Sequence, residues 1–119
     1  MNIPKIIERI KKGEDQRTEF KESFRTNRFG DIDKNLPSKI SRAICGFLNS
    51  TGGDLFIGVD DSGNIVGIEK DIESYSKSDY MKGKDLLLKQ VSNNIRQNVG
   101  NLAVDKVEPI FYQDPNYPE

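Results

Sequence analysis

The chain has 119 residues, contains no histidine and one cysteine, and carries a formal net charge of −1 at pH 7. The lack of histidine excludes catalytic triads with an imidazole base and zinc sites with histidine ligands. Any catalysis would have to use carboxylates, lysine, tyrosine, hydroxyls or a metal ion bound by oxygen atoms. The single cysteine argues against a disulfide framework and favours a reducing, cytoplasmic location.

The length of the chain predicts one domain over residues 1–119. Apolar side chains make up only 34% of the residues, so we expect a thin core that a partner subunit helps to bury, as in a homodimer. No apolar run approaches the roughly 20 residues that a membrane span needs. We therefore expect no membrane partner.

Helix and strand patterns alternate through the first half of the chain. Isoleucines at helical spacing predict a helix over residues 3–12, and alternating residue types predict a strand over residues 17–23. Residues 24–37 combine glycine, asparagine and aspartate with several cations, which is typical of a long loop. A second amphipathic pattern predicts a helix over residues 38–49, which the glycines that follow it would end.

A β-hairpin is predicted directly after this helix. The short apolar run at residues 54–59 indicates a buried strand, and the sequence DDSGN at residues 60–64 is typical of a turn. Residues 65–68 would return as the second arm of the hairpin.

The remaining residues complete a mixed helix and strand pattern. Residues 69–84 are polar and are typical of a loop, a helix is predicted from about 83 to 99, and residues 102–112 predict a last strand. The order of elements predicts an α+β domain with a small mixed or mostly antiparallel sheet and packed helices. The chain stops at DPNYPE, where a further hairpin arm would return. We therefore expect a fragment of a longer protein, or a sheet edge that another chain completes.

Three motifs in this order resemble the Schlafen AlbA-like domain of bacterial and archaeal regulators and of animal Schlafen proteins. The first is Gly13-Glu14 followed by TEFK at residues 18–21, the second is the helix and turn SKISRAICGFLNSTGG, and the third is DLFIGVDDSGNIVGI. The resemblance covers about residues 3–111. It implies the Schlafen AlbA-like fold and nucleic-acid binding, and, as in some Schlafen proteins, metal-dependent cleavage of structured RNA.

The resemblance also implies a set of acidic catalytic residues, namely Glu14, Glu19 and either Asp60 or Asp61. Strand alternation places Asp61 on the face of Leu55, Ile57 and Val59, and Asp60 on the face of Phe56 and Gly58. It does not decide between the two aspartates, and the candidate metal ligands are Glu14, Glu19 and Asp61. Converging carboxylates suit Mg²⁺ or Mn²⁺, and Lys21, on the same strand face as Glu19, could meet a phosphate. The structural alternative is that Glu14 and the two aspartates serve turns, and that Glu19 and Lys21 form an exposed ion pair.

Basic residues gather in the first part of the chain, although the chain as a whole is not basic. A nucleic acid, either RNA or DNA, would be bound through its phosphates by such a local cluster. The structural alternative is a set of solvated helix faces. The candidate phosphate-binding residues are Arg17, Lys21, Arg25, Arg28, Lys34, Lys39 and Arg42.

Several functions therefore compete. The first is a nucleic-acid-binding Schlafen-type domain with metal-dependent endoribonuclease activity, and the second is a non-catalytic DNA-binding or dimerisation module of a bacterial transcription regulator. A third is a protein-interaction domain that pairs a free strand edge with another chain. We expect no ATP site, because the chain has no phosphate-binding P-loop motif and its Thr51-Gly52-Gly53 ends a helix.

Overall fold

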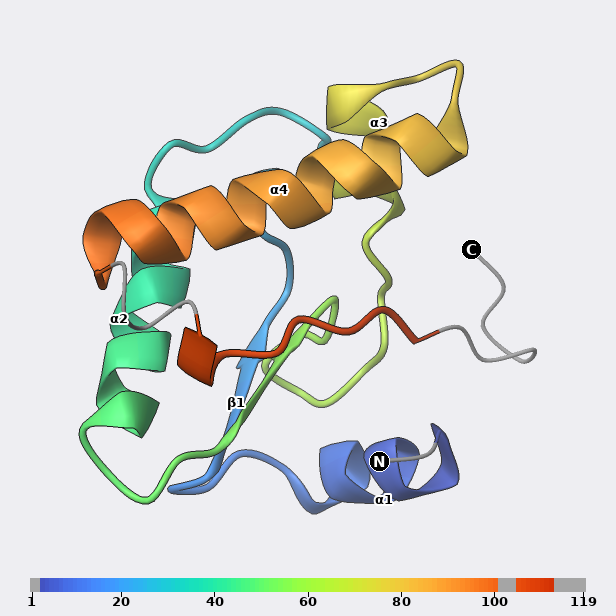
Figure 1. Ribbon diagram of the computed structural model, residues 1–119. Coiled ribbons are helices and arrows are strands. Elements are labelled where there is room, and N and C mark those ends of the chain that lie inside the picture. The colour runs from blue at the N-terminus through green and yellow to red at the C-terminus, as the bar shows by residue number, and fades with distance from the viewer. Residues whose placement is uncertain (1–2, 101–104, 113–119) are drawn as a thin grey trace.

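The computed structural model of the protein describes residues 3–100 and 105–112. Four helices and two strands make up the described part of the chain, and helix α4 lies across one end of the strands while α1 lies near the other end (Figure 1). In chain order the elements are α1 (Ile3–Lys12), β1 (Thr18–Lys21), α2 (Leu36–Leu48), β2 (Asp54–Ile57), α3 (Glu69–Tyr75) and α4 (Tyr80–Asn98). The α+β class is confirmed. The helices at the start and in the middle of the chain lie close to their predicted bounds.

The two strands form a parallel pair, with Thr18 opposite Asp54 and Lys21 opposite Ile57. The prediction of a mixed or mostly antiparallel sheet is therefore wrong for the residues that the structure describes. The reason is the connection, because α2 carries the chain from the end of β1 back to the start of β2. A helical crossover of this kind joins parallel strands, whereas a tight hairpin joins antiparallel ones.

The predicted hairpin after β2 is reduced to one antiparallel bridge between Val59 and Ile65. Gly58 ends the strand, because its φ of 99° takes the chain out of the extended conformation. The Gly58 carbonyl accepts hydrogen bonds from the N–H groups of Val66 (2.7 Å) and Gly67 (3.0 Å). The returning segment is thus held by this bridge and these hydrogen bonds and does not form a second strand.

The prediction of a loop over residues 69–84 is wrong, because this segment contains α3 and the first turns of α4. Asp79 caps α4, and its side chain accepts a hydrogen bond from the N–H of Lys82 (3.1 Å). Gly83 lets the two helices approach closely, since a Cβ there would lie 2.6 Å from the Ile72 carbonyl oxygen.

The predicted last strand, residues 102–112, is wrong where the structure describes it. Asp105 and Lys106 form a short 3₁₀ turn, and residues 107–112 have no regular secondary structure. Residues 102–104 lie outside the described part. Val107 and Phe111 of this segment pack against the larger core cluster, so it covers the core without joining the sheet.

The core consists of two apolar clusters on opposite faces of the sheet. The larger cluster joins α2, α3 and α4, and Leu55 and Ile57 of β2 pack against it. The smaller cluster joins α1 to the other face, where Phe20 and Phe56 pack together. No helix in the described residues is long and apolar enough to cross a membrane.

Candidate nucleic-acid interface

Glu14 closes the turn between α1 and β1. Its Oε2 atom accepts a hydrogen bond from the backbone N–H of Phe20 (2.9 Å), while the side chain as a whole remains exposed. Gly13 ends α1 with a φ of 85°. The Glu14 carboxylate therefore satisfies a backbone donor of β1 itself, which is a structural role.

Glu19 and Lys21 form an ion pair on one face of β1, with 3.3 Å between Nζ and Oε1. Their side chains are 36% and 28% exposed, respectively. The predicted placement of these two residues on the same strand face is confirmed. Because the lysine ammonium faces a carboxylate, it is partly neutralised at the position where a phosphate would bind.

Asp60 organises the turn that follows Gly58. Its Oδ1 atom accepts from the N–H groups of Asn64 (2.9 Å) and Ser62 (3.0 Å), and the Asn64 amide donates to its Oδ2 atom. The backbone hydrogen bond from Asn64 is the main cause that lowers the pKa of Asp60 below its ordinary value. Such a set of bonds is typical of an Asx-turn.

Asp61 is exposed, and its carboxylate forms no hydrogen bond or ion pair with residues 3–100 or 105–112. Strand alternation does not reach this residue, because the chain turns at Gly58. Val59 packs with Phe20 on the α1 face of the sheet, whereas Leu55 packs on the other face. The prediction that Val59 shares a face with Leu55, from which the placement of Asp61 was extended, is therefore wrong.

The acidic residues do not form a metal-ligand set in the described part of the chain. No three histidine, cysteine, aspartate or glutamate side chains there lie close enough to hold one ion. Glu14 and Asp60 instead accept hydrogen bonds from backbone N–H groups. Because these carboxylates do not converge, the residues present do not fit an Mg²⁺ or Mn²⁺ ion, and no metal chemistry follows from the geometry.

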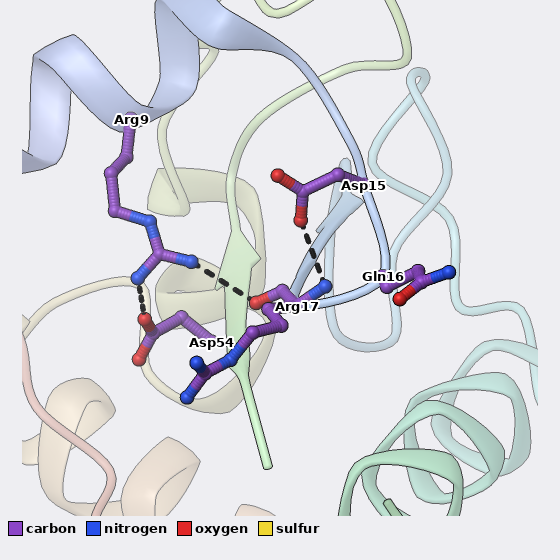
Figure 2. Close-up of a pocket in the computed structure, with 5 residues that line it drawn as sticks. All are labelled: Arg9, Asp15, Gln16, Arg17 and Asp54. Carbon is purple, nitrogen blue, oxygen red and sulfur yellow. Dashed lines mark hydrogen bonds and ion pairs between the residues drawn. The ribbon is translucent and has the colours of Figure 1, made fainter. Parts of the chain in front are cut away.

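One open pocket, with a volume of about 570 Å³, lies where α1 meets the start of both strands. Arg9 forms an ion pair with Asp54 there, and it donates to Thr18 Oγ1 (2.6 Å) and to the Arg17 carbonyl oxygen (3.1 Å). Figure 2 shows Arg9, Arg17 and Asp54 among the residues that line the pocket, and it draws no bond from the Arg17 guanidinium. Arg9 is thus occupied in joining α1 to the sheet, while Arg17 is exposed.

Arg25 is also occupied by contacts within the fold. Its guanidinium donates to the side-chain oxygen and the carbonyl oxygen of Ser74, both at 2.9 Å. It also lies over the ring of Tyr75, with 3.5 Å from Cζ to the ring centroid. Arg25, one of the predicted phosphate-binding residues, therefore holds the segment after β1 against α3.

Asp71 is the residue of this region that the sequence analysis missed. It is 0% exposed, and its carboxylate accepts from the N–H groups of Phe24 (2.7 Å), Arg25 (2.9 Å) and Thr26 (3.1 Å). The Thr26 hydroxyl adds a fourth bond at 3.0 Å. The helical spacing of Ile68, Ile72 and Tyr75 could have indicated α3, but its partners lie about 45 residues earlier in the chain.

The other predicted phosphate-binding residues remain exposed. Lys39 and Arg42 lie three residues apart on the solvent face of α2, and Lys34 lies just before this helix. Their side chains, like that of Arg28, form no hydrogen bond or ion pair within residues 3–100 and 105–112. No acidic residue occurs between Asp33 and Asp54. Around α2 the positive charge is therefore not neutralised by neighbouring carboxylates in the chain.

The comparison with protein-family models agrees with the three motifs. The model described as "Schlafen, AlbA_2" matches residues 14–115, which is most of the chain. This chain belongs to the Schlafen AlbA_2 family. Neither the search of curated proteins nor the search of solved structures found a match. Membership of the Schlafen AlbA_2 family suggests that the domain binds nucleic acid.

In this Schlafen AlbA_2 domain, the motif glycines shape the scaffold. A Cβ on Gly53 would lie 2.6 Å from the Phe47 ring and 2.8 Å from the Arg17 carbonyl oxygen. The turn from α2 into β2 therefore needs glycine at this position. The second motif carries α2 with its exposed cations, and along the chain this helix connects the two paired strands that the first and third motifs supply.

Proposed function

We propose that this Schlafen AlbA_2 domain binds nucleic acid through the phosphate backbone, with Lys34, Lys39 and Arg42 as the main contacts. The observation that carries this proposal is the unneutralised positive surface of α2. These three side chains are exposed and unpaired within the described residues, and the chain has no acidic residue from residue 34 to residue 53. Each cation that meets a phosphate releases condensed counterions, which favours binding without regard to sequence.

The polarity of α2 adds to this attraction. The helix has no acidic residue in its first turn, and no side chain caps its N-terminus at Asn35. The N-terminal end of a helix carries a partial positive charge. The Asn35 and Leu36 N–H groups at this end donate to Asp33, and Pro37 has no N–H. The attraction for an anion here therefore comes from the helix dipole and from the side chains of Lys34 and Lys39, which flank this end.

We propose that binding takes place without cleavage. The carboxylates expected to form a nuclease site serve the fold instead, since Glu14 and Asp60 accept backbone hydrogen bonds and Glu19 pairs with Lys21. This arrangement favours the non-catalytic module, such as the DNA-binding part of a regulator, over the endoribonuclease. The homodimer stays a prediction, which sedimentation of the free and the bound domain would test.

The binding test compares two triple variants by fluorescence anisotropy with labelled RNA and DNA. The first variant is Lys34→Gln, Lys39→Gln and Arg42→Gln. The matched control removes the same charge elsewhere, at the exposed residues Lys77, Lys82 and Lys89, each changed to Gln. Affinities are measured between about 50 and 200 mM salt, where phosphate contacts change binding strongly.

The α2 variant should lose about tenfold or more in affinity at low salt. Its plot of log affinity against log salt should be shallower by about two to three, because each lost phosphate contact lowers the slope by about one. The control variant should keep the wild-type slope. Equal losses in both variants, or binding that does not depend on salt, would contradict the proposed interface.

A parallel incubation tests cleavage. Labelled structured RNA is kept with Mg²⁺, Mn²⁺ or EDTA and either the wild type or the Glu14→Gln, Glu19→Gln double variant. A glutamine at position 14 can still accept from the Phe20 N–H, so the double variant should fold. We expect intact RNA in every sample. Metal-dependent cutting that the double variant loses would establish a nuclease site.

A further inference from the structure

The segment after β1 ends in a short hairpin whose tip presents Phe29 to solvent. Thr26 and Ile32 form an antiparallel bridge at its base. Phe29 is 82% exposed, the largest value among the exposed large apolar residues of the described chain. An aromatic ring held so far from the core contributes little to packing, which raises the question of what it contacts.

Hydrogen bonds fix the conformation of the tip. The Asn27 side-chain oxygen accepts from the N–H groups of Phe29 (2.9 Å) and Asp31 (3.0 Å). The Asn27 N–H donates to the Asp31 carbonyl oxygen at 2.8 Å, and the Gly30 N–H donates to the Asn27 carbonyl oxygen at 2.9 Å. Gly30 takes a φ of 87°, so the backbone reverses directly after Phe29.

The base of the hairpin is anchored to α3 through buried groups. The Asp71 carboxylate binds the backbone on both sides of Arg25, and the Arg25 side chain is bonded to Ser74. The Lys70 ammonium donates to the Arg28 carbonyl oxygen. Phe29 therefore projects from an ordered support, and a ligand that contacts the ring would not need to order the loop first.

The charge around the tip fits a polyanion. Residues 26–42 contain four exposed cations (Arg28, Lys34, Lys39, Arg42) and two acidic residues (Asp31, Asp33). Arg28 adjoins Phe29 in the chain and is itself exposed, and Asp33 uses its side chain to accept from the Asn35 N–H (2.9 Å). An aromatic face next to phosphate-binding cations is the arrangement that proteins use to hold single-stranded nucleic acid.

We propose that Phe29 stacks on an unpaired base of the nucleic acid whose phosphates α2 binds, so that the domain prefers single-stranded segments over fully paired duplex. This inference rests on the proposed nucleic-acid binding. Stacking needs a base face that is free of its neighbours, which a duplex interior does not offer. The ring fits this role better than a protein interface, because an interface core is poor in charged residues and the tip is rich in them.

The test compares Phe29→Ala, Phe29→Trp and Met81→Ala with the wild type. Met81 is the matched control, because it is also strongly exposed (63%) and apolar but lies on α4. The probes are single-stranded RNA and DNA oligonucleotides that carry 2-aminopurine, and the fully paired duplexes of the same sequences. Binding is read by anisotropy, and base stacking is read by the 2-aminopurine fluorescence.

Phe29→Ala should lower the affinity for single strands about fivefold to a hundredfold, the range that loss of one base–aromatic stack produces. Its affinity for duplex, and its thermal unfolding midpoint, should match those of the wild type. Phe29→Trp should keep the single-strand affinity and the change in 2-aminopurine fluorescence. Met81→Ala should bind like the wild type.

Two results would overturn the stacking role while leaving the proposed function intact. The first is that Phe29→Ala binds single strands with the affinity of the wild type while the α2 triple variant loses binding. Phe29 would then contact another class of partner, such as a protein. The other is an equal loss for single strands and duplex. Absence of binding to every probe by the wild-type domain would instead overturn the proposed function itself.

Discussion

Two regions of the molecule use charged side chains in opposite ways. Around α3, Asp71 and Arg25 form their contacts within the fold. The Asp71 carboxylate is fully buried, and the Arg25 guanidinium is hydrogen-bonded to Ser74 and stacked on Tyr75. On the outer face of α2, Lys39 and Arg42 are exposed and unpaired within the described residues. The comparison teaches that burial and partners, rather than the number of charges, decide which side chains are free to bind a ligand.

The strongest test of the first region is Asp71→Ala. It would leave three backbone N–H groups and one hydroxyl of residues 24–26 without their acceptor, so the free energy of unfolding should fall by about 3–5 kcal/mol. Urea denaturation followed by circular dichroism measures this loss. Asp85→Ala is the control, because Asp85 is exposed on α4, and the expected change is under about 0.5 kcal/mol. Similar stability of both variants would show that Asp71 does not anchor the hairpin.

Arg25 and Arg28 lie three residues apart in the chain and allow the same comparison within the hairpin segment. Arg25→Ala should lower the free energy of unfolding by about 1–2 kcal/mol, because it removes two hydrogen bonds and a cation–π contact. Arg28→Ala should leave stability unchanged and weaken nucleic-acid binding instead, which urea denaturation and anisotropy measure together. A loss of stability in Arg28→Ala together with a loss of binding alone in Arg25→Ala would contradict the view that Arg25 serves the fold and Arg28 is free to bind a ligand.

Arg9 extends the comparison to α1. Arg9→Ala should lower the free energy of unfolding by about 1 kcal/mol, because its ion pair with Asp54 is partly exposed and its bond to the buried Thr18 hydroxyl is lost. Lys11→Ala, at an exposed position of the same helix, is the control and should have no effect on urea denaturation. A larger effect at Lys11 would mean that α1 is held by other contacts.

The smallest expected effect concerns Asp60. Its pKa lies below the ordinary value of 3.8, chiefly because of the Asn64 backbone hydrogen bond. Because the pKa of Asp60 is lower in the folded state, the charged carboxylate stabilises the turn at pH values above the ordinary pKa. This stabilisation is lost as the pH falls through the pKa of the folded state. Titration of the Asp60 carboxyl carbon by NMR should give a midpoint below 3.8. Asn64→Ala keeps the backbone N–H and removes only the side-chain hydrogen bond, so it should raise the midpoint slightly. A midpoint at or above 3.8 would contradict the structural role of Asp60.

The sequence predicted the long helices and both strands because their signals are local. Isoleucines at helical spacing mark α1, and Ile6 and Ile10 are indeed buried in the smaller cluster. Helix α3 was missed because it is short and polar, and of its apolar residues Ile72 alone is buried. The parallel pairing was missed because the run after β2 resembled a hairpin, whereas Gly58 turns the chain away.

The candidate site was harder to predict for a physical reason. Whether a charged side chain is free depends on partners that are distant in sequence, such as Asp71 for the Thr26 N–H and Asp54 for Arg9. The motif residues predicted the family, and the basic cluster contained the exposed cations. Neither signal could distinguish Arg25, whose side chain has partners within the fold, from Arg42, whose side chain is exposed.

The most direct test of the proposed interface is an NMR titration of the ¹⁵N-labelled domain with a single-stranded oligonucleotide. We predict that amide shifts change over residues 34–46, just before and along α2, and over residues 27–31 at the hairpin tip. Amides next to Glu14, Glu19, Asp60 and Asp61 should change little. Shift changes that instead gather around these acidic residues, with α2 unaffected, would contradict the central claim that the exposed cations of α2 bind the phosphates.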